Sequence, residues 1–250
     1  MTLDFTNIDT KTLTSTRAMF AYCDKPRTLT VLNLDTSNVE NMNCMFQNCE
    51  RLEVLNLPNF NTGNVEKMEG MFGSCVKLNS LDLSSFDTLH VNSMAGMFHA
   101  CESLEAINLS SFNTSNTKSM ADMFCGCISI KKLDLSKFDT MRLNLAASMF
   151  NKCKSLEEIK LDNFDTINVM HTVKMFNGCE SLKKLNLSRF RLLEIQNMSH
   201  KIDDRHLMSE MFNGCTRLVE IILPYDAYSK FKIGEQLRID GIHCRTISKS

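Results

Sequence analysis

The chain has 250 residues and carries 28 Lys and Arg against 29 Asp and Glu, which gives a formal net charge of −1 at pH 7. This balance excludes the strongly basic composition that is typical of proteins that bind nucleic acid or acidic membranes. With 43% hydrophobic residues, a chain of this length can bury a sizeable core.

The first residues, MTLDFTNIDTKTLTSTRAMF, contain no basic run followed by an apolar stretch, so they lack the pattern of a secretory signal. The sequence also contains no apolar run of about 18 residues, the length that indicates a transmembrane helix. We therefore predict a cytoplasmic location without membrane insertion. Residues 1–13 look like half of a repeat unit, because Leu3 and Phe5 match Leu55 and Leu57 of a later unit.

A Met-Phe pair recurs along the chain at a fixed spacing. Met71-Phe72 follows Met45-Phe46 at a 26-residue interval, here called the repeat length, and a cysteine stands at the third position after each Phe. The pairs begin at Met19, Met45, Met71, Met97, Met123, Met149, Met175 and Met211. The cysteines that follow them, here called the ladder cysteines, are Cys23, Cys49, Cys75, Cys101, Cys127, Cys153, Cys179 and Cys215.

Each unit then contains a short segment with alternating leucines, such as LEVLNL from Leu52 or LKKLNL from Leu182. Strict alternation of apolar and polar residues indicates a half-buried strand. The segment SSFDT at Ser84 to Thr88 follows one such strand, and related segments follow the others. Because Ser, Asp and Thr side chains can bind backbone amides in turns, these segments indicate the corners between elements.

Beyond each corner the apolar spacing changes to three or four residues, which predicts a short amphipathic helix. One example is the set Val65, Met68, Met71, Phe72 and Cys75. A strand-plus-helix unit of this size cannot bury both faces alone, so neighbouring units must stack. The prediction for residues 1–223 is an α/β repeat solenoid of about eight 26-residue units, with one parallel β-sheet and short helices.

Two segments depart from the repeat. The last Met-Phe pair comes later than the repeat length predicts, which places ten extra residues between 190 and 211. Insertions in repeat proteins form surface loops that often bind a partner, although a neutral change in loop length is the alternative. The pattern stops at Pro224, and we predict that residues 224–250 form a C-terminal segment that caps the last strand.

The ladder cysteines are predicted to be reduced core residues, because equivalent positions in every unit suit a small stacked hydrophobe. Disulfides between neighbouring units remain the alternative. The paired C-x-x-C spacing of a zinc site is missing, and no histidine is singled out as the partner of a nucleophilic cysteine. We therefore expect no catalytic residue, no metal and no cofactor, with His200, His206, Asp203 and Asp204 as the weaker metal-binding alternative.

Two groups of surface residues are predicted to contact a partner. The lysines of the later strands could steer a protein onto the sheet face, although a mixed charge pattern also fits a merely solvated sheet. The inserted loop is the second candidate. The two groups are Lys131, Lys132, Lys160, Lys183 and Lys184 on the sheet, and His200, Lys201, Asp203, Asp204, Arg205 and His206 in the loop.

The repeated pattern MFxxCxxLxxLxLSxFDT resembles the BspA-type leucine-rich repeats, in particular the 25 to 26-residue variety of mycoplasma and other bacterial surface proteins. The resemblance covers about residues 3–223 and implies a leucine-rich-repeat solenoid used for adhesion or other protein recognition, without an active site. We predict a non-catalytic scaffold that recognises another protein, and that inhibits or recruits it in a host-pathogen or host-phage setting. The alternative is a secreted or cell-surface adhesin or structural module.

Overall fold

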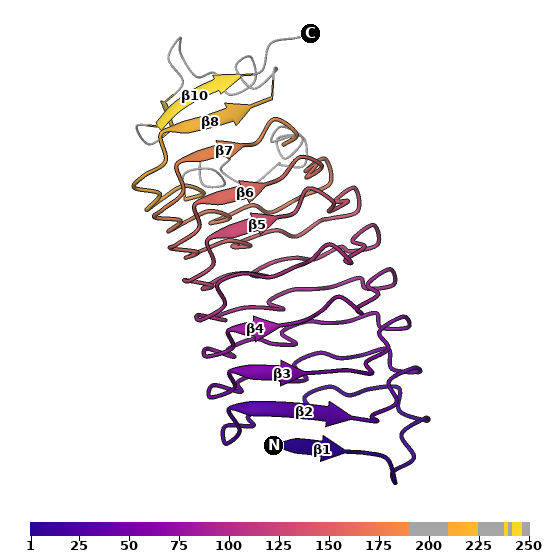
Figure 1. The fold of residues 1–250 in the computed structure, drawn as a ribbon. Coiled ribbons are helices and arrows are strands. Elements are labelled where there is room, and N and C mark those ends of the chain that lie inside the picture. The colour runs from indigo at the N-terminus through magenta and orange to yellow at the C-terminus, as the bar shows by residue number, and fades with distance from the viewer. Residues whose placement is uncertain (191–209, 225–237, 240–241, 247–250) are drawn as a thin grey trace.

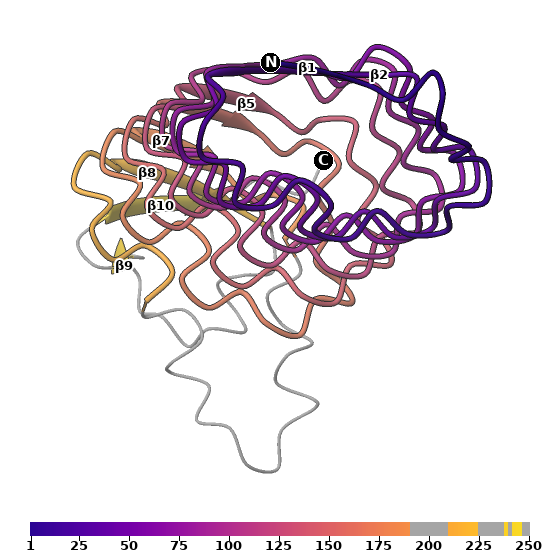
Figure 2. The same cartoon turned by 90° about the horizontal axis from the view of Figure 1, so that it is seen from below.

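The computed structural model describes residues 1–190, 210–224, 238–239 and 242–246. Figure 1 shows that the chain winds upward from its N-terminus, and each winding is here called a rung, with the short strands lying on the same side. Figure 2, seen from below, shows the rungs as successive loops that are progressively offset, with β1 and β2 along one edge of the first loops and a zigzag return path along the other. The molecule is therefore a solenoid of parallel strands.

The strands are short because only one or two side chains of each point into the core. Leu55 lies opposite both Leu29 and Leu81 in the parallel register, so equivalent leucines of successive rungs face one another. The strands are β1 (Thr2–Asp4), β2 (Thr28–Leu32), β3 (Val54–Asn56), β4 (Ser80–Leu81), β5 (Lys132–Asp134), β6 (Glu158–Lys160), β7 (Lys184–Asn186), β8 (Glu220–Leu223), β9 (Arg238–Ile239) and β10 (Ile242–Thr246).

The prediction of one continuous sheet is wrong in detail. The described strands form three sheets, in the orders β1-β2-β3-β4, β5-β6 and β7-β8-β10-β9. The segment LEAINL from Leu104 contains no strand, although Leu104 itself is buried. A second parallel ladder of single bridges runs through Ser93 and Ser119 on the return path. Because this ladder also holds neighbouring rungs in register, the stack does not need unbroken strand pairing.

The prediction of short helices is also wrong, since no helix occurs in the described ranges. In the segment of each rung that carries the Met-Phe pair, alternate backbone N–H groups donate to the next rung instead of to their own turn. Met42 donates to the Lys67 carbonyl at 2.9 Å, Cys44 to Glu69 at 2.8 Å and Phe46 to Met71 at 2.9 Å. These bonds all run in the same direction along the solenoid.

The residues between these donors form tight turns, as in the 3.0 Å bond from the Gln47 N–H to the Cys44 carbonyl. Left-handed residues recur four positions apart in this segment, with φ of 58° at Cys44 and 59° at Asn48. One left-handed residue in every four stops a right-handed helix from continuing. The segment is consequently a chain of successive turns, and it buries the same side chains at intervals of three and four that a helix would bury.

The core is built from columns of identical side chains. Phe98 stacks on Phe72 with ring centroids 5.7 Å apart and on Phe124 at 5.4 Å, and all three rings are fully buried. The thiol of Cys127 donates to the Phe98 carbonyl at 3.1 Å. Equivalent thiol bonds run from Cys49 through Cys215. The cysteines described by the structure are all free of disulfides, and Cys23 is only partly buried.

A column of buried threonines holds the corners together. The Thr88 hydroxyl donates to the Asn113 carbonyl at 2.9 Å and accepts from the Asn113 backbone N–H at 2.8 Å. Thr62 makes the same two bonds with Asp87, and Thr36 makes them with Asn61. Each buried hydroxyl therefore satisfies both backbone groups of one residue in the next rung.

The C-terminal strands extend the stack. β10 pairs with β8 in parallel, with Cys244 opposite Ile221, and β9 pairs with β10 in the antiparallel sense. The ten-residue insertion and the loop residues predicted to bind a partner fall in 191–209, outside the described residues. Within the described part of the chain, no helix has the length and apolar character needed to cross a membrane.

The ladder geometry predicts unequal reactivity of the cysteines. Burial raises the pKa of the Cys101 thiol to about 12, so little thiolate exists at neutral pH. Cys44 is only partly buried. On iodoacetamide treatment of the native chain, mass mapping should show Cys101 modified at least about a hundredfold more slowly than Cys44, because the thiolate is the reactive form. Equal rates in the native state would contradict this packing, and denatured chain provides the control.

Candidate interaction surface

The exposed face of the strands, here called the strand face, carries charged side chains in columns along the solenoid. Neighbouring side chains in a column belong to adjacent rungs, and several of them form ion pairs between a lysine and a carboxylate. Lys132 lies 3.1 Å from Glu158, and Lys160 lies 2.9 Å from Asp134. The Ser136 hydroxyl and the Lys160 ammonium lower the pKa of Asp134 to about 2, so this carboxylate is ionised at neutral pH.

The lysines predicted to contact a partner all lie on the strand face, and most of them are paired within the chain. Lys131 lies 3.6 Å from Glu105, and Lys184 lies 3.0 Å from Glu220, in addition to the pairs of Lys132 and Lys160. Lys183 is exposed. Exposed pairs of this kind add little stability, about 0 to 1 kcal/mol each, but they offset most of the positive charge that a partner would meet.

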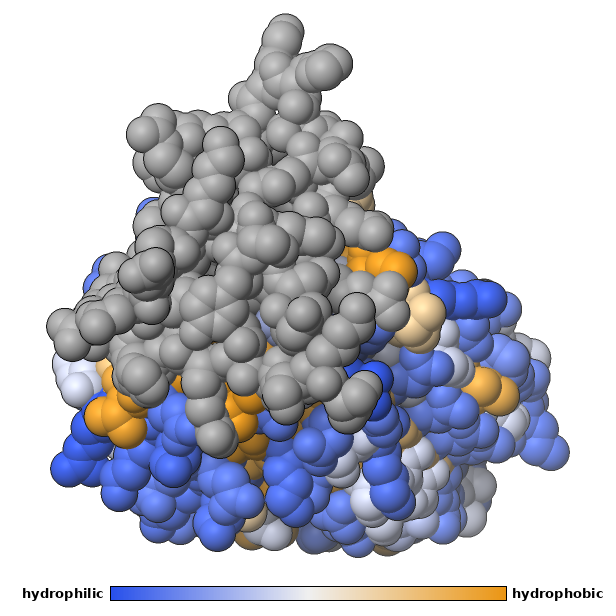
Figure 3. Space-filling view, turned by 90° about the horizontal axis from the view of Figure 1, so that it is seen from above, coloured by the Kyte–Doolittle hydropathy of each residue, from blue (hydrophilic) through white to orange (hydrophobic). Residues whose placement is uncertain are grey.

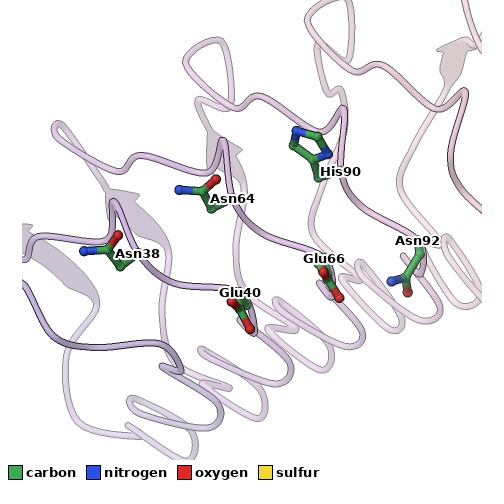
Figure 4. A pocket seen from close by; sticks show the side chains of 6 residues that line it. All are labelled: Asn38, Glu40, Asn64, Glu66, His90 and Asn92. Atoms are coloured by element: carbon green, nitrogen blue, oxygen red, sulfur yellow. The ribbon is translucent and has the colours of Figure 1, made fainter.

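A polar groove lies on the return path, in the N-terminal half of the solenoid. It is lined by Asn38, Glu40, Asn64, Glu66, His90 and Asn92. Figure 4 shows two rows: Asn38, Asn64 and His90 follow one line across three rungs, and Glu40, Glu66 and Asn92 follow a second line beside it. Each row repeats once per rung, so the groove is a direct product of the stacking.

The asparagine row is fixed by side-chain hydrogen bonds to the preceding rung. Asn38 Nδ2 donates to the Lys11 carbonyl at 2.8 Å, and Asn64 Nδ2 donates to the Ser37 carbonyl at 2.7 Å. Each amide therefore has its nitrogen engaged with the backbone. This arrangement holds one wall of the groove in place before any ligand binds.

The second row brings two carboxylates side by side. The Glu66 backbone N–H donates to the Glu40 carbonyl at 2.8 Å, so the two residues sit directly above one another. Both side chains are exposed, and neither carboxylate forms an ion pair or a side-chain hydrogen bond with the described residues. The groove therefore carries negative charge that is not compensated in the way that the strand-face charges are.

Sequence reasoning missed this groove because it compared the exposed positions of the strands, and beyond the corner only the apolar positions. Asn38, Asn64 and His90 are spaced by the repeat length, as are Glu40, Glu66 and Asn92. Aligning the units at these positions would have revealed both rows.

The described surface offers no large apolar patch in the view of Figure 3, where hydrophilic residues predominate and the hydrophobic residues form separate spots. Leu145 and Met170 are among the exposed hydrophobic residues of the chain. The polar residues visible on this face favour binding through charge and hydrogen bonds over binding through a broad hydrophobic interface.

Comparison with known proteins places the repeat among bacterial sequences. The family described as "Mycoplasma protein of unknown function, DUF285" matches residues 1–106, 72–190 and 105–222. A leucine-rich repeat protein from Bacteroides ovatus is 18% identical with a TM-score of 0.42, and the match covers 92% of this chain and 63% of that chain. A leucine-rich cell surface protein from Faecalibacterium prausnitzii is 13% identical with a TM-score of 0.32, over 89% and 79%. No curated protein matches the chain.

Proposed function

This chain belongs to the DUF285 family of Mycoplasma proteins, and on that premise we propose that it is a non-catalytic scaffold whose polar groove binds a basic segment of another protein. The family match confirms the resemblance to the mycoplasma-type repeats. The observation that supports the groove is the pair of adjacent carboxylates, Glu40 and Glu66, which lack a cation from the described residues while most strand-face charges are paired.

The rigidity of the groove favours recognition. Stacked rungs hold its two rows at fixed spacing, and the asparagine amides are already bonded to the backbone. A rigid, preformed surface loses little conformational entropy on binding, which raises affinity for a given set of contacts. Complementary charge adds specificity and a faster association rate more than it adds affinity. A lysine- or arginine-rich segment laid along the solenoid would meet the carboxylates of two successive rungs.

The finer proposal is that the bound protein comes from a host or a phage, and that the scaffold inhibits or recruits it. The surface-adhesin alternative would place the same groove on the outside of the cell. Protease treatment of intact cells, followed by detection of the chain, separates the two settings, because only an exposed chain is digested.

The double variant Glu40→Gln/Glu66→Gln should reduce binding of the partner by at least about tenfold, since two charge-assisted contacts are removed. Partners are captured from host-cell and phage-infected extracts on immobilised native chain and identified by mass spectrometry. The matched control is Glu50→Gln/Glu102→Gln, which makes the same change in net charge at exposed residues outside the groove. A second variant changes Lys131, Lys132, Lys160, Lys183 and Lys184 to Glu.

If one captured protein is lost only with Glu40→Gln/Glu66→Gln, the result supports the groove as its binding site. If the partner is lost only with the lysine variant, the groove is not the binding site. The site would then lie on the strand face, where sequence reasoning placed it. If the native chain captures no protein beyond what beads without the chain capture, the recognition proposal fails.

A further inference from the structure

Three side chains of types that can ligate a metal gather on the return path in the middle of the solenoid, and none of them lines the groove. They are His99, Asp122 and Cys125, and one ligand atom of each lies within 4.8 Å of the others. His99 comes from one rung, while Asp122 and Cys125 come from the next. The cluster therefore joins two neighbouring rungs of the stack.

The fold explains why these residues meet. His99 and Cys125 are separated by one repeat length and occupy the same position of successive rungs. The Cys125 backbone N–H donates to the Asp122 carbonyl at 3.0 Å, and the Ala100 N–H donates to the Cys125 carbonyl at 2.7 Å. Asp122 is one of the left-handed residues, with φ of 57°, a conformation that Asp tolerates better than most residues.

The repeat itself does not require these three residues. Cys125 is not one of the ladder cysteines. Other rungs place Gln47, Gly73 or Asn151 at the position of His99 and Cys125, and Gly96 or Ser148 at the position of Asp122. The fold thus accepts small and polar side chains at both positions. Stacking of the rungs therefore does not explain why an imidazole, a carboxylate and a thiol meet at this one place.

We propose that His99, Asp122 and Cys125 bind a divalent transition metal of the Zn²⁺ type. Zn²⁺ takes Cys sulfur at about 2.3 Å, His nitrogen at about 2.0 to 2.1 Å and carboxylate oxygen at about 2.0 to 2.2 Å, in tetrahedral geometry. Ligand atoms in such a site are roughly 3.5 Å apart, so small side-chain rotations would close the present cluster around one ion. His99 is exposed and can make this adjustment.

The neighbouring Asn151 adds a second layer to the site. Its Nδ2 donates to Cys125 Sγ at 3.6 Å, and its Oδ1 is buried without a hydrogen-bond partner in the described part of the chain. Outer-layer donors to a ligating sulfur are typical of metal sites. Three protein ligands leave the fourth position to water, and a water held by the metal would supply the donor that Asn151 Oδ1 lacks.

The free site holds a thiol, because burial and the adjacent Asp122 carboxylate raise the pKa of Cys125. Metal binding replaces the thiol proton, which passes to solvent, so the sulfur becomes a thiolate ligand. The bound ion would then clamp two neighbouring rungs to each other through their side chains.

The test is a Co²⁺ titration of the full chain under reducing conditions, because Co²⁺ replaces Zn²⁺ and its thiolate complexes show a charge-transfer absorption in the near ultraviolet. We expect one equivalent of Co²⁺ to produce this absorption and Zn²⁺ to abolish it. The variants borrow residues from equivalent positions of other rungs: His99→Gln as in Gln47, Asp122→Ser as in Ser148, and Cys125→Asn as in Asn151. Each should weaken binding by at least about tenfold.

The matched control is Cys44→Ser, which removes a partly buried thiol elsewhere and should leave the titration unchanged. Circular dichroism of each variant without metal verifies folding, and His99→Gln changes only an exposed side chain. An absence of charge-transfer absorption in the native chain, or the same absorption in His99→Gln, would overturn the proposal.

Discussion

Replacing Phe98 by alanine should lower the free energy of unfolding by about 3 to 5 kcal/mol. Phe98 is fully buried and stacks against Phe72 and Phe124, with centroid distances of 5.7 and 5.4 Å. Truncation removes the transfer free energy of the ring and leaves a cavity that two stacked neighbours can fill only partly. It also removes two aromatic contacts, each worth about 0.5 to 1.5 kcal/mol.

Urea unfolding followed by circular dichroism measures this loss. Tyr22→Ala serves as the control, because Tyr22 is 69% exposed and its removal should change stability by less than about 0.5 kcal/mol. Because repeat proteins can unfold in parts, the midpoint and the slope of the transition should both be compared. A loss of less than about 1 kcal/mol in Phe98→Ala would show that the phenylalanine column contributes little.

Replacing Thr88 by valine should cost about 2 to 4 kcal/mol, although the two side chains have nearly the same shape. The Thr88 hydroxyl donates to the Asn113 carbonyl and accepts from the Asn113 N–H. Valine leaves both backbone groups without these partners beside a buried side chain, and a group left unsatisfied away from water costs about 1 to 3 kcal/mol. The loss is again measured by urea unfolding.

The same substitution at Thr117 should change the free energy of unfolding much less. Thr117 is also fully buried, but it stands one repeat length after Val91 and two after Val65, in a column where valine is already accommodated. Its hydroxyl makes a single bond, to the Val91 carbonyl at 3.0 Å. Thr117→Val should therefore change stability by less than about 1 kcal/mol. Equal losses at Thr88 and Thr117 would contradict the bridging role of the corner threonines.

The regular repeat length predicted much of the fold. It identified the solenoid, the parallel strands and the positions that face the core. A register held over many units indicates that the units stack and that equivalent residues lie beside one another. The helices were predicted wrongly because the spacing of Met68, Met71, Phe72 and Cys75 fits two structures equally well. One is a helix, and the other is a series of tight turns separated by residues with left-handed φ. What separates the two is the direction of the backbone N–H groups, and side-chain periodicity carries no information about it.

The surface was harder to predict because its chemistry depends on pairs across rungs. Lys132, Lys160 and Lys184 lie in strands, and Lys131 and Lys183 stand directly before β5 and β7. The pairing of lysines with carboxylates of adjacent rungs, as in Lys132 and Glu158, reduces the free charge that the sequence indicated. Glu40 and Glu66 lie beyond the corner, where only the apolar positions of the units were compared. The loop residues from His200 to His206 lie outside the described structure, and their binding role stays a prediction.

The one-way hydrogen bonds of the Met-Phe segments give this side of the solenoid an electrical polarity. In each rung, N–H groups such as those of Cys44 and Phe46 point toward the C-terminal end, and the carbonyls that accept them point toward the N-terminal end. Peptide dipoles that alternate in an ordinary sheet would nearly cancel, but here they add, as they do in an α-helix. The N-terminal end of these stacked segments is therefore partially negative and favours cations, while the opposite end favours anions, in a molecule whose formal net charge is only −1.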